Sequence, residues 1–203
     1  MKKEDAKRGS EKLFMGNVDL IPLFASFSVV FLAELGDKTQ ICTIILSSRS
    51  SVFSIFLGAM SAFFIVNGLS VLLGRELLNF LPQTIISLAA GLIFILFGLI
   101  SLLHKDRKTI FRNTNIKSSF IKTFLLISLM ELGDKTQIAS ILLAAQFGDP
   151  LMVLAGVMLA FSVLTGIGVF LGCKILRFIP ERYLKVGSSA VFIILGILLI
   201  FKL

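Results

Sequence analysis

Long apolar runs separated by short polar segments dominate the chain. Six runs can be followed, at about 20–46, 52–73, 83–103, 120–145, 151–172 and 184–201. Each has roughly the 17 to 25 residues that a membrane-spanning helix needs. Because lipid offers the backbone no hydrogen-bond partners, helices are expected and not strands. The pattern therefore predicts an all-α integral membrane protein with six transmembrane helices.

Composition supports this prediction. Hydrophobic residues make up 56% of the 203 residues and charged residues 16%, and the mean hydropathy is +0.97. An average soluble domain carries about 25% charged residues. The net charge of +8 is concentrated in the N-terminal tail and two loops. In such a chain, basic clusters indicate membrane orientation and anionic lipid in preference to nucleic acid.

The six runs form two copies of three. The sequence "ELGDKTQICTIIL" at 34–46 matches "ELGDKTQIASILL" at 131–143, an offset of 97 residues. Further on, "VLLGRELLNFLP" at 71–82 matches "VFLGCKILRFIP" at 169–180, an offset of 98. The expected organisation is a basic tail (1–18), a first three-helix repeat (19–103), a basic linker (104–119) and a second three-helix repeat (120–203).

An odd number of spans in each copy has a geometric consequence. The second copy must enter the membrane from the opposite side, so two inverted three-helix repeats are predicted, a plan that many secondary transporters share. The loops that would face inside when the N-terminus lies outside carry more Lys and Arg than the loops that would face outside. The positive-inside rule therefore favours both termini outside, although the basic tail opposes that orientation.

Each copy places charged residues inside its first apolar run. A charge at the centre of a spanning helix costs about 2.5–3.5 kcal/mol on insertion scales and is functional by default. Acids three residues apart share one face of an ideal helix. Gly36 and Gly133 permit close helix approach or local unwinding of the backbone. The candidate ligands are four acids: Glu34, Asp37, Glu131 and Asp134.

Neutral oxygens accompany the acids in the next turn. They belong to Thr39, Gln40, Thr136 and Gln137. Carboxylate, carbonyl and water ligands favour Mg²⁺, Ca²⁺ or Mn²⁺, whereas Zn²⁺ and Cu⁺ sites usually recruit His or Cys. The only histidine, His104, stands at the end of a run. A hard divalent cation is therefore the expected ligand, as a transported ion and not as a cofactor.

The two lysines of the motifs affect the charge of such a site. Four carboxylates less Lys38 and Lys135 leave two negative charges, which one divalent cation would neutralise. Like charges in a low-dielectric site disfavour ionisation, so the empty site is expected to hold protons and to release them when metal binds. This is the outline of a cation–proton exchanger.

Some residues allow more than one interpretation. Glu34 and Lys38 could simply pair as residues four apart on one helix, and the lysines could either shape the site or act in it. Asn67 could line the ion pathway, although hydrogen bonding between helices is the commoner role of such a residue.

The doubled "ELGDKT" motif resembles the signature of the Gdt-type family of manganese and calcium exchangers. That signature is Glu, a hydrophobic residue, Gly, Asp, Lys or Arg, then Ser or Thr, once in each half, and residues 34–39 and 131–136 fill it completely. The resemblance implies export of Mn²⁺, or alternatively transport of Ca²⁺, in exchange for protons. The small size and the lack of organelle-targeting features suggest the plasma membrane of a prokaryote.

Three rival functions were weighed. Membrane aspartyl proteases also use paired intramembrane aspartates, but they need a Gly-x-Gly-Asp sequence, and here Glu34 stands two residues before Gly36. A Tyr-Asp pair and a Pro-Ala-Leu segment are also lacking, so an enzyme is not expected. An exporter of amino acids or small organic cations could use a similar six-helix plan. A membrane scaffold would not require the matched acids.

Overall fold

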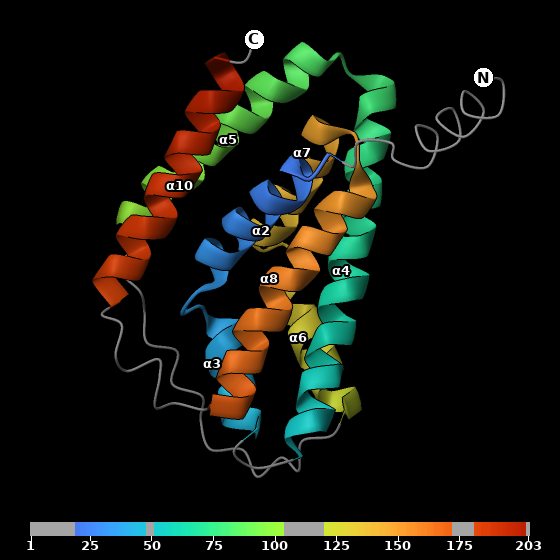
Figure 1. The fold of residues 1–203 in the computed structure, drawn as a ribbon, viewed down its shortest axis with the longest axis vertical. Helices are drawn as coiled ribbons and strands as arrows, with labels where there is room; N and C mark the ends of the chain where they lie inside the picture. Colours follow the sequence, from blue (N-terminus) through green and yellow to red (C-terminus); the bar gives the residue numbers. More distant parts are fainter. Residues whose placement is uncertain (1–18, 48–50, 104–119, 172–180, 202–203) are drawn as a thin grey trace, which may run out of the picture.

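The computed structural model describes residues 19–47, 51–103, 120–171 and 181–201. The predicted tail and linker, with His104, lie outside this part of the chain. The described residues form the helices α2 (Ile21–Glu34), α3 (Lys38–Ser47), α4 (Val52–Phe80), α5 (Gln83–Leu103), α6 (Phe120–Glu131), α7 (Lys135–Phe147), α8 (Pro150–Leu171) and α10 (Glu181–Phe201). The prediction of an all-helical protein is confirmed for these residues (Figure 1).

Within the described residues, three helices are individually long and apolar enough to cross a membrane. They are α4, α5 over Gln83–Ile100 and α8 over Pro150–Phe170. The apolar parts of α2 and α10 are shorter. Large apolar side chains such as Phe24, Phe64 and Phe170 are exposed on the outer surfaces of the helices. Exposed apolar surface of this extent suits contact with lipid and not with water.

The two runs that carry the charged motifs are not continuous helices. The first run divides into α2 and α3, and the second into α6 and α7. Gly36 has φ 84° and Gly133 has φ 80°, a left-handed conformation that residues with a side chain rarely adopt. The expectation that Glu34 and Asp37 share one face of a helix is therefore wrong, because α2 ends at Glu34.

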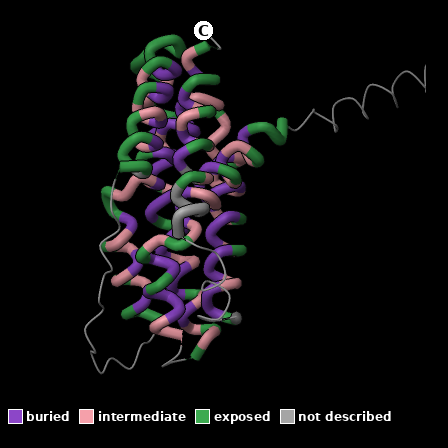
Figure 2. The backbone as a smooth tube through the Cα atoms, turned by 90° about the vertical axis from the view of Figure 1, so that its left-hand side faces the viewer, coloured by how far each residue is buried: buried purple, intermediate pink, exposed green. Residues whose placement is uncertain are grey.

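The broken helices pack against the long helices α4 and α8. Helix α2 packs against α8, α6 packs against α4, and α4 and α8 also contact each other. Helices α5 and α10 pair along their length and stand to one side of the other six (Figure 1). Buried residues face the interior of this arrangement and exposed residues face outward (Figure 2). The glutamates that precede the two breaks are thus buried between helices, whereas Gly36 and Gly133 are exposed.

Glycines let equivalent helices of the two halves approach closely. A Cβ at Gly58 on α4 would lie 2.8 Å from the carbonyl oxygen of Phe120 on α6. At the equivalent Gly156 on α8, a Cβ would collide with the carbonyl oxygen of Leu23 and the hydroxyl of Ser26 on α2. Because Leu23 and Phe120 are themselves repeat equivalents, the α8–α2 contact reproduces the α4–α6 contact.

Equivalent aromatic residues also meet each other directly. The rings of Phe63 on α4 and Phe161 on α8 stack with their centroids 3.8 Å apart. Phe94 on α5 and Phe192 on α10 lie with their centroids 5.8 Å apart. Residues that are equivalent in the two halves therefore face each other at the interface between them.

Candidate cation site

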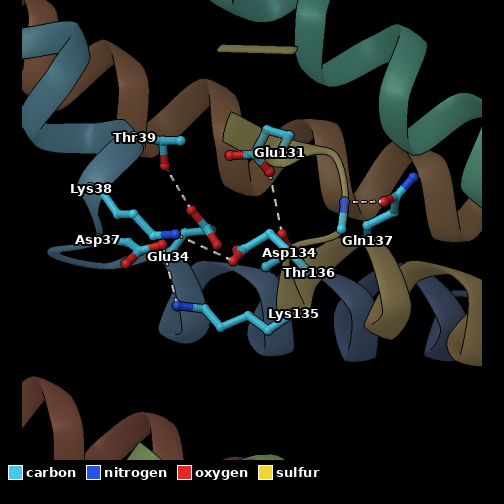
Figure 3. Close-up of polar contacts among 10 residues, drawn as sticks. Glu34, Asp37, Lys38, Thr39, Glu131, Asp134, Lys135, Thr136 and Gln137 are labelled. Atoms are coloured by element: carbon cyan, nitrogen blue, oxygen red, sulfur yellow. Dashed lines mark hydrogen bonds and ion pairs between the residues drawn. The ribbon is translucent and has the colours of Figure 1, made fainter. Parts of the chain in front are cut away.

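The ends of α2 and α6 bring two glutamates together in the protein interior. Glu34 is the last residue of α2 and Glu131 the last residue of α6, and they are 2% and 1% exposed. Asp134 lies beside them, and one carboxylate oxygen from each of the three acids lies within 4.8 Å of the others (Figure 3). Calcium ligands stand about 2.3–2.6 Å from the ion. Oxygens this close together are within reach of a single such ion.

Each glutamate has one oxygen fixed and one oxygen free. Thr39 donates its hydroxyl hydrogen to Oε2 of Glu34 at 3.0 Å, and Thr136 does the same for Oε2 of Glu131 at 3.3 Å. Among the described residues, Oε1 of Glu34 and Oε1 of Glu131 are buried with no hydrogen-bond partner. Buried polar atoms in proteins are rarely left unpaired. A proton or a cation would satisfy both oxygens.

Glutamine side chains support the backbone at both helix breaks. Oε1 of Gln40 accepts a hydrogen bond from the backbone N–H of Gly36 at 2.7 Å, and Oε1 of Gln137 accepts one from Gly133 at 2.7 Å. The breaks end in Asp37 and Asp134, which precede α3 and α7. The structure shows these glutamine oxygens bound to the backbone beside the site, and their predicted role as neutral oxygens in the second shell or the pathway stays a prediction.

The lysines pair across the two halves and not within one helix. Nζ of Lys38 lies 3.9 Å from Oδ1 of Asp134, and Nζ of Lys135 lies 3.3 Å from Oδ2 of Asp37 (Figure 3). The alternative of a Glu34–Lys38 pair along one helix is therefore not what the structure contains. Each lysine instead connects its own half to the aspartate of the other half.

Asp37 lies outside the close group that the other three acids form, and it pairs with Lys135. The members of that group are Glu34, Glu131 and Asp134. The four acids predicted as ligands thus divide into a group of three and a fourth acid held by Lys135.

Asn67 connects helices next to the site. Its side chain is buried, its Nδ2 donates to the carbonyl oxygen of Phe63, and its Oδ1 accepts from the hydroxyl of Ser140 at 2.9 Å. This contact joins α4 to α7. Of the two interpretations open from the sequence, the structure favours hydrogen bonding between helices.

A small cavity of about 10 Å³ lies beside Glu34. Phe63, Phe161, Thr39 and Thr165 are among the residues that line it. This is about the volume that one water molecule needs. Sequence reasoning did not single out the two phenylalanines, although their equivalent places in the two repeats were a signal that could have found them.

The chain was compared with known proteins. The family model described as "Divalent cation/proton antiporter GDT1" matches residues 22–109 and 119–203. A GDT1-like protein of Schizosaccharomyces pombe is 27% identical over 249 residues, which cover 96% of this chain and 94% of the relative. Protein PAM71, chloroplastic, of Arabidopsis thaliana is 29% identical over 209 residues, covering 87% of this chain and 56% of the relative. No solved structure matches.

Proposed function

Because the chain belongs to the GDT1 family of divalent cation/proton antiporters, we propose that it exports Mn²⁺ across its membrane in exchange for protons. Glu34, Glu131, Asp134 and Asp37 are the proposed ligands. Mn²⁺ and Ca²⁺ both accept oxygen ligands, so the choice of Mn²⁺ rests on the resemblance of the doubled motif to manganese exchangers. Ca²⁺ is the alternative cargo.

One observation supports this function above the others. Two buried glutamates, one from each half, each have an unpaired oxygen, and their carboxylates lie close together beside that of Asp134. Burying a carboxylate without a partner is costly, and a protein tolerates that cost where the group is used. A divalent cation bound between the halves would satisfy both oxygens at once.

The same pair of oxygens offers a way to couple the cation to protons. With no cation present, protons on the glutamates would relieve the repulsion between neighbouring carboxylates in a low-dielectric interior. A cation entering the site would take their place. Protons and the metal would then use the same oxygens in turn, which is what exchange requires.

We further propose six membrane crossings in two inverted three-helix repeats. Helix α2 with α3 would form one crossing, and α6 with α7 another, while α4, α5, α8 and α10 each form one. The reciprocal glycine and phenylalanine contacts support this plan, because a two-fold axis between the halves produces such contacts. Broken helices with their ends at a central site are typical of such transporters.

A small organic cation or amino acid is a weaker candidate cargo. The cavity beside Glu34 has room for about one water molecule, which suits an ion better than an organic molecule. Thr39 and Thr136 supply only small hydroxyl groups toward the glutamates.

Transport by the purified chain in proteoliposomes tests the proposal. Uptake of Mn²⁺, Ca²⁺ and Mg²⁺ would be measured with and without a pH gradient. Glu34→Gln should abolish uptake, because an amide cannot replace the anionic oxygen. The matched control is Glu76→Gln, which changes an exposed glutamate on α4 and should transport normally. Wild-type uptake by a folded Glu34→Gln variant would disprove the site.

A further inference from the structure

The two lysines of the repeated motif face different situations in this structure, although the sequence gives them equivalent positions. Building on the proposed function, we propose that Lys38 and Lys135 are positioning residues that determine which aspartate completes the cation site. In this conformation the ion pair with Lys135 keeps Asp37 from binding the cation, and the cation is bound by Glu34, Glu131 and Asp134. In the conformation in which the two halves exchange roles, the ion pair with Lys38 keeps Asp134 from binding the cation, and Asp37 becomes the third ligand.

The asymmetry of the two ion pairs is the first observation. The Lys135–Asp37 pair is the shorter, at 3.3 Å, and the side chain of Lys135 is 33% exposed. The Lys38–Asp134 pair measures 3.9 Å, and the side chain of Lys38 is 52% exposed. Only Asp134, the aspartate of the looser pair, lies with the two glutamates. The aspartate of the tighter pair thus lies outside the close group of acids, and the aspartate of the looser pair lies within it.

The helices show a second asymmetry. Helix α10 packs against α2, whereas α5 has at most marginal contact with α6 within the described part of the chain, although these two pairs are equivalent in the repeats. Helices α5 and α10 pair with each other at one side of the assembly (Figure 1). The two halves thus have different surroundings in this conformation. A conformation in which α5 packs against α6 and α10 leaves α2 would exchange the roles of the two aspartates. Asp37 would then bind the cation, and Asp134 would pair with its lysine.

Charge gives the exchange a use. The affinity of an oxygen site for a cation rises with the number of charged ligands. With all four acids free, the site would bind the cation tightly and release it slowly. Holding one aspartate back limits the site to three acids at a time. When the protein changes from one conformation to the other, the aspartate held by its lysine is released and the other aspartate is held instead. Each conformation therefore has a site with three acidic ligands.

Lys135→Gln is the variant that tests this role. Freeing Asp37 should tighten equilibrium binding of Mn²⁺ to the purified protein by about tenfold, because the affinity of an oxygen site rises with the number of charged ligands. Maximal transport in proteoliposomes should fall by a similar factor, because release slows. Lys135→Arg keeps the charge and should restore both quantities. Arg75→Gln, at an exposed position on α4, is the control and should change neither.

A double-variant cycle separates this role from a structural one. Binding would be measured for Asp37→Asn with and without Lys135→Gln. If Lys135 acts through Asp37, its replacement should have no further effect on Mn²⁺ affinity in the Asp37→Asn protein. Loss of binding together with transport in Lys135→Gln, or an equal gain in affinity in both backgrounds, would overturn the inference. A wild-type protein that binds and transports no divalent cation would instead refute the proposed function.

Discussion

Thr39 and Thr136 hold the two central glutamates in place. Each donates its hydroxyl to Oε2 of the glutamate five residues earlier, which leaves Oε1 as the unpaired oxygen. Because the helix breaks lie between the partners, these bonds also span the irregular backbone. Thr39 and Thr136, which belong to the repeated motif, therefore orient the glutamates of the same motif.

Removing this bond should weaken transport without destroying the fold. Thr39→Val has a similar shape but leaves Oε2 of Glu34 without its donor. We expect the KM for Mn²⁺ to rise by about tenfold, as is typical when a group that orients a ligand is lost. Thr39→Ser retains the hydroxyl and should remain close to wild type. The role is refuted if Thr39→Val keeps the wild-type KM, or if Thr39→Ser is as impaired as Thr39→Val.

At the residue scale, the sequence suggested candidate site residues but not how they pair. The cost of intramembrane charge and the exact repetition of the motif were enough to select the four acids. The crossed pairs between Lys38 and Asp134 and between Lys135 and Asp37 depend on how the halves meet. Local spacing allowed a contact between Glu34 and Lys38 along one helix, whereas the structure pairs each lysine with the aspartate of the other half.

Glycines on α4 show how the helices set the distance between the halves. At Gly74, a Cβ would collide with the carbonyl oxygen of Ile141 on α7 and lie 2.8 Å from Cβ of Ala144. At Gly68, six residues earlier on the same helix, nothing lies within 4 Å of such a Cβ. The first glycine is required by packing, and the second is not.

Alanine substitution at these two positions should have opposite results. Gly74→Ala must push α4 and α7 apart and should cost about 1–3 kcal/mol, which is typical of overpacking. Gly68→Ala should be neutral or stabilising by up to about 1 kcal/mol, because alanine favours the helix. Thermal unfolding in detergent would measure both. Equal melting temperatures for the two variants would contradict the close α4–α7 contact.

The helix breaks are the elements that hydropathy could not define. Apolar residues continue on both sides of the motifs, so the pattern predicted one long run in each half. Gly36 and Gly133 allowed local unwinding, but only the backbone conformation, with φ 84° and 80°, shows that the helices end there. A glycine permits a break in a helix. At both breaks the backbone N–H of the glycine is bound by a glutamine side chain, Gln40 or Gln137.

The duplication of the sequence predicts the arrangement of the whole molecule. Three apolar segments in each half predicted inverted repeats, and the reciprocal contacts support that proposal. The tail and linker charges on which the orientation depends lie outside the described residues, so the placement of both termini outside stays a prediction. The relatives reported above are eukaryotic and include a chloroplast protein, so they give no support to the expected prokaryotic plasma membrane.

Equivalent positions in the two halves should lie on opposite sides of the membrane. Ser51 precedes α4 and Asp149 precedes α8, at an offset of 98 residues. Single cysteines at these positions, in a protein without its natural cysteines, would be treated with a membrane-impermeant maleimide in intact cells. With both termini outside, the cysteine at 149 should react and the cysteine at 51 should not. Reaction of both from the same side would contradict the inverted plan.

The central claim is that two glutamates, one from each half, hold a divalent cation and protons in turn. Its most direct test records Mn²⁺ entry and proton exit together in the same proteoliposomes, for the wild type and for Glu131→Gln. The account predicts that Mn²⁺ entering the wild-type vesicles is matched by protons leaving, and that both fluxes disappear in the folded variant. Mn²⁺ transport without any proton movement, or undiminished transport by Glu131→Gln, would contradict it.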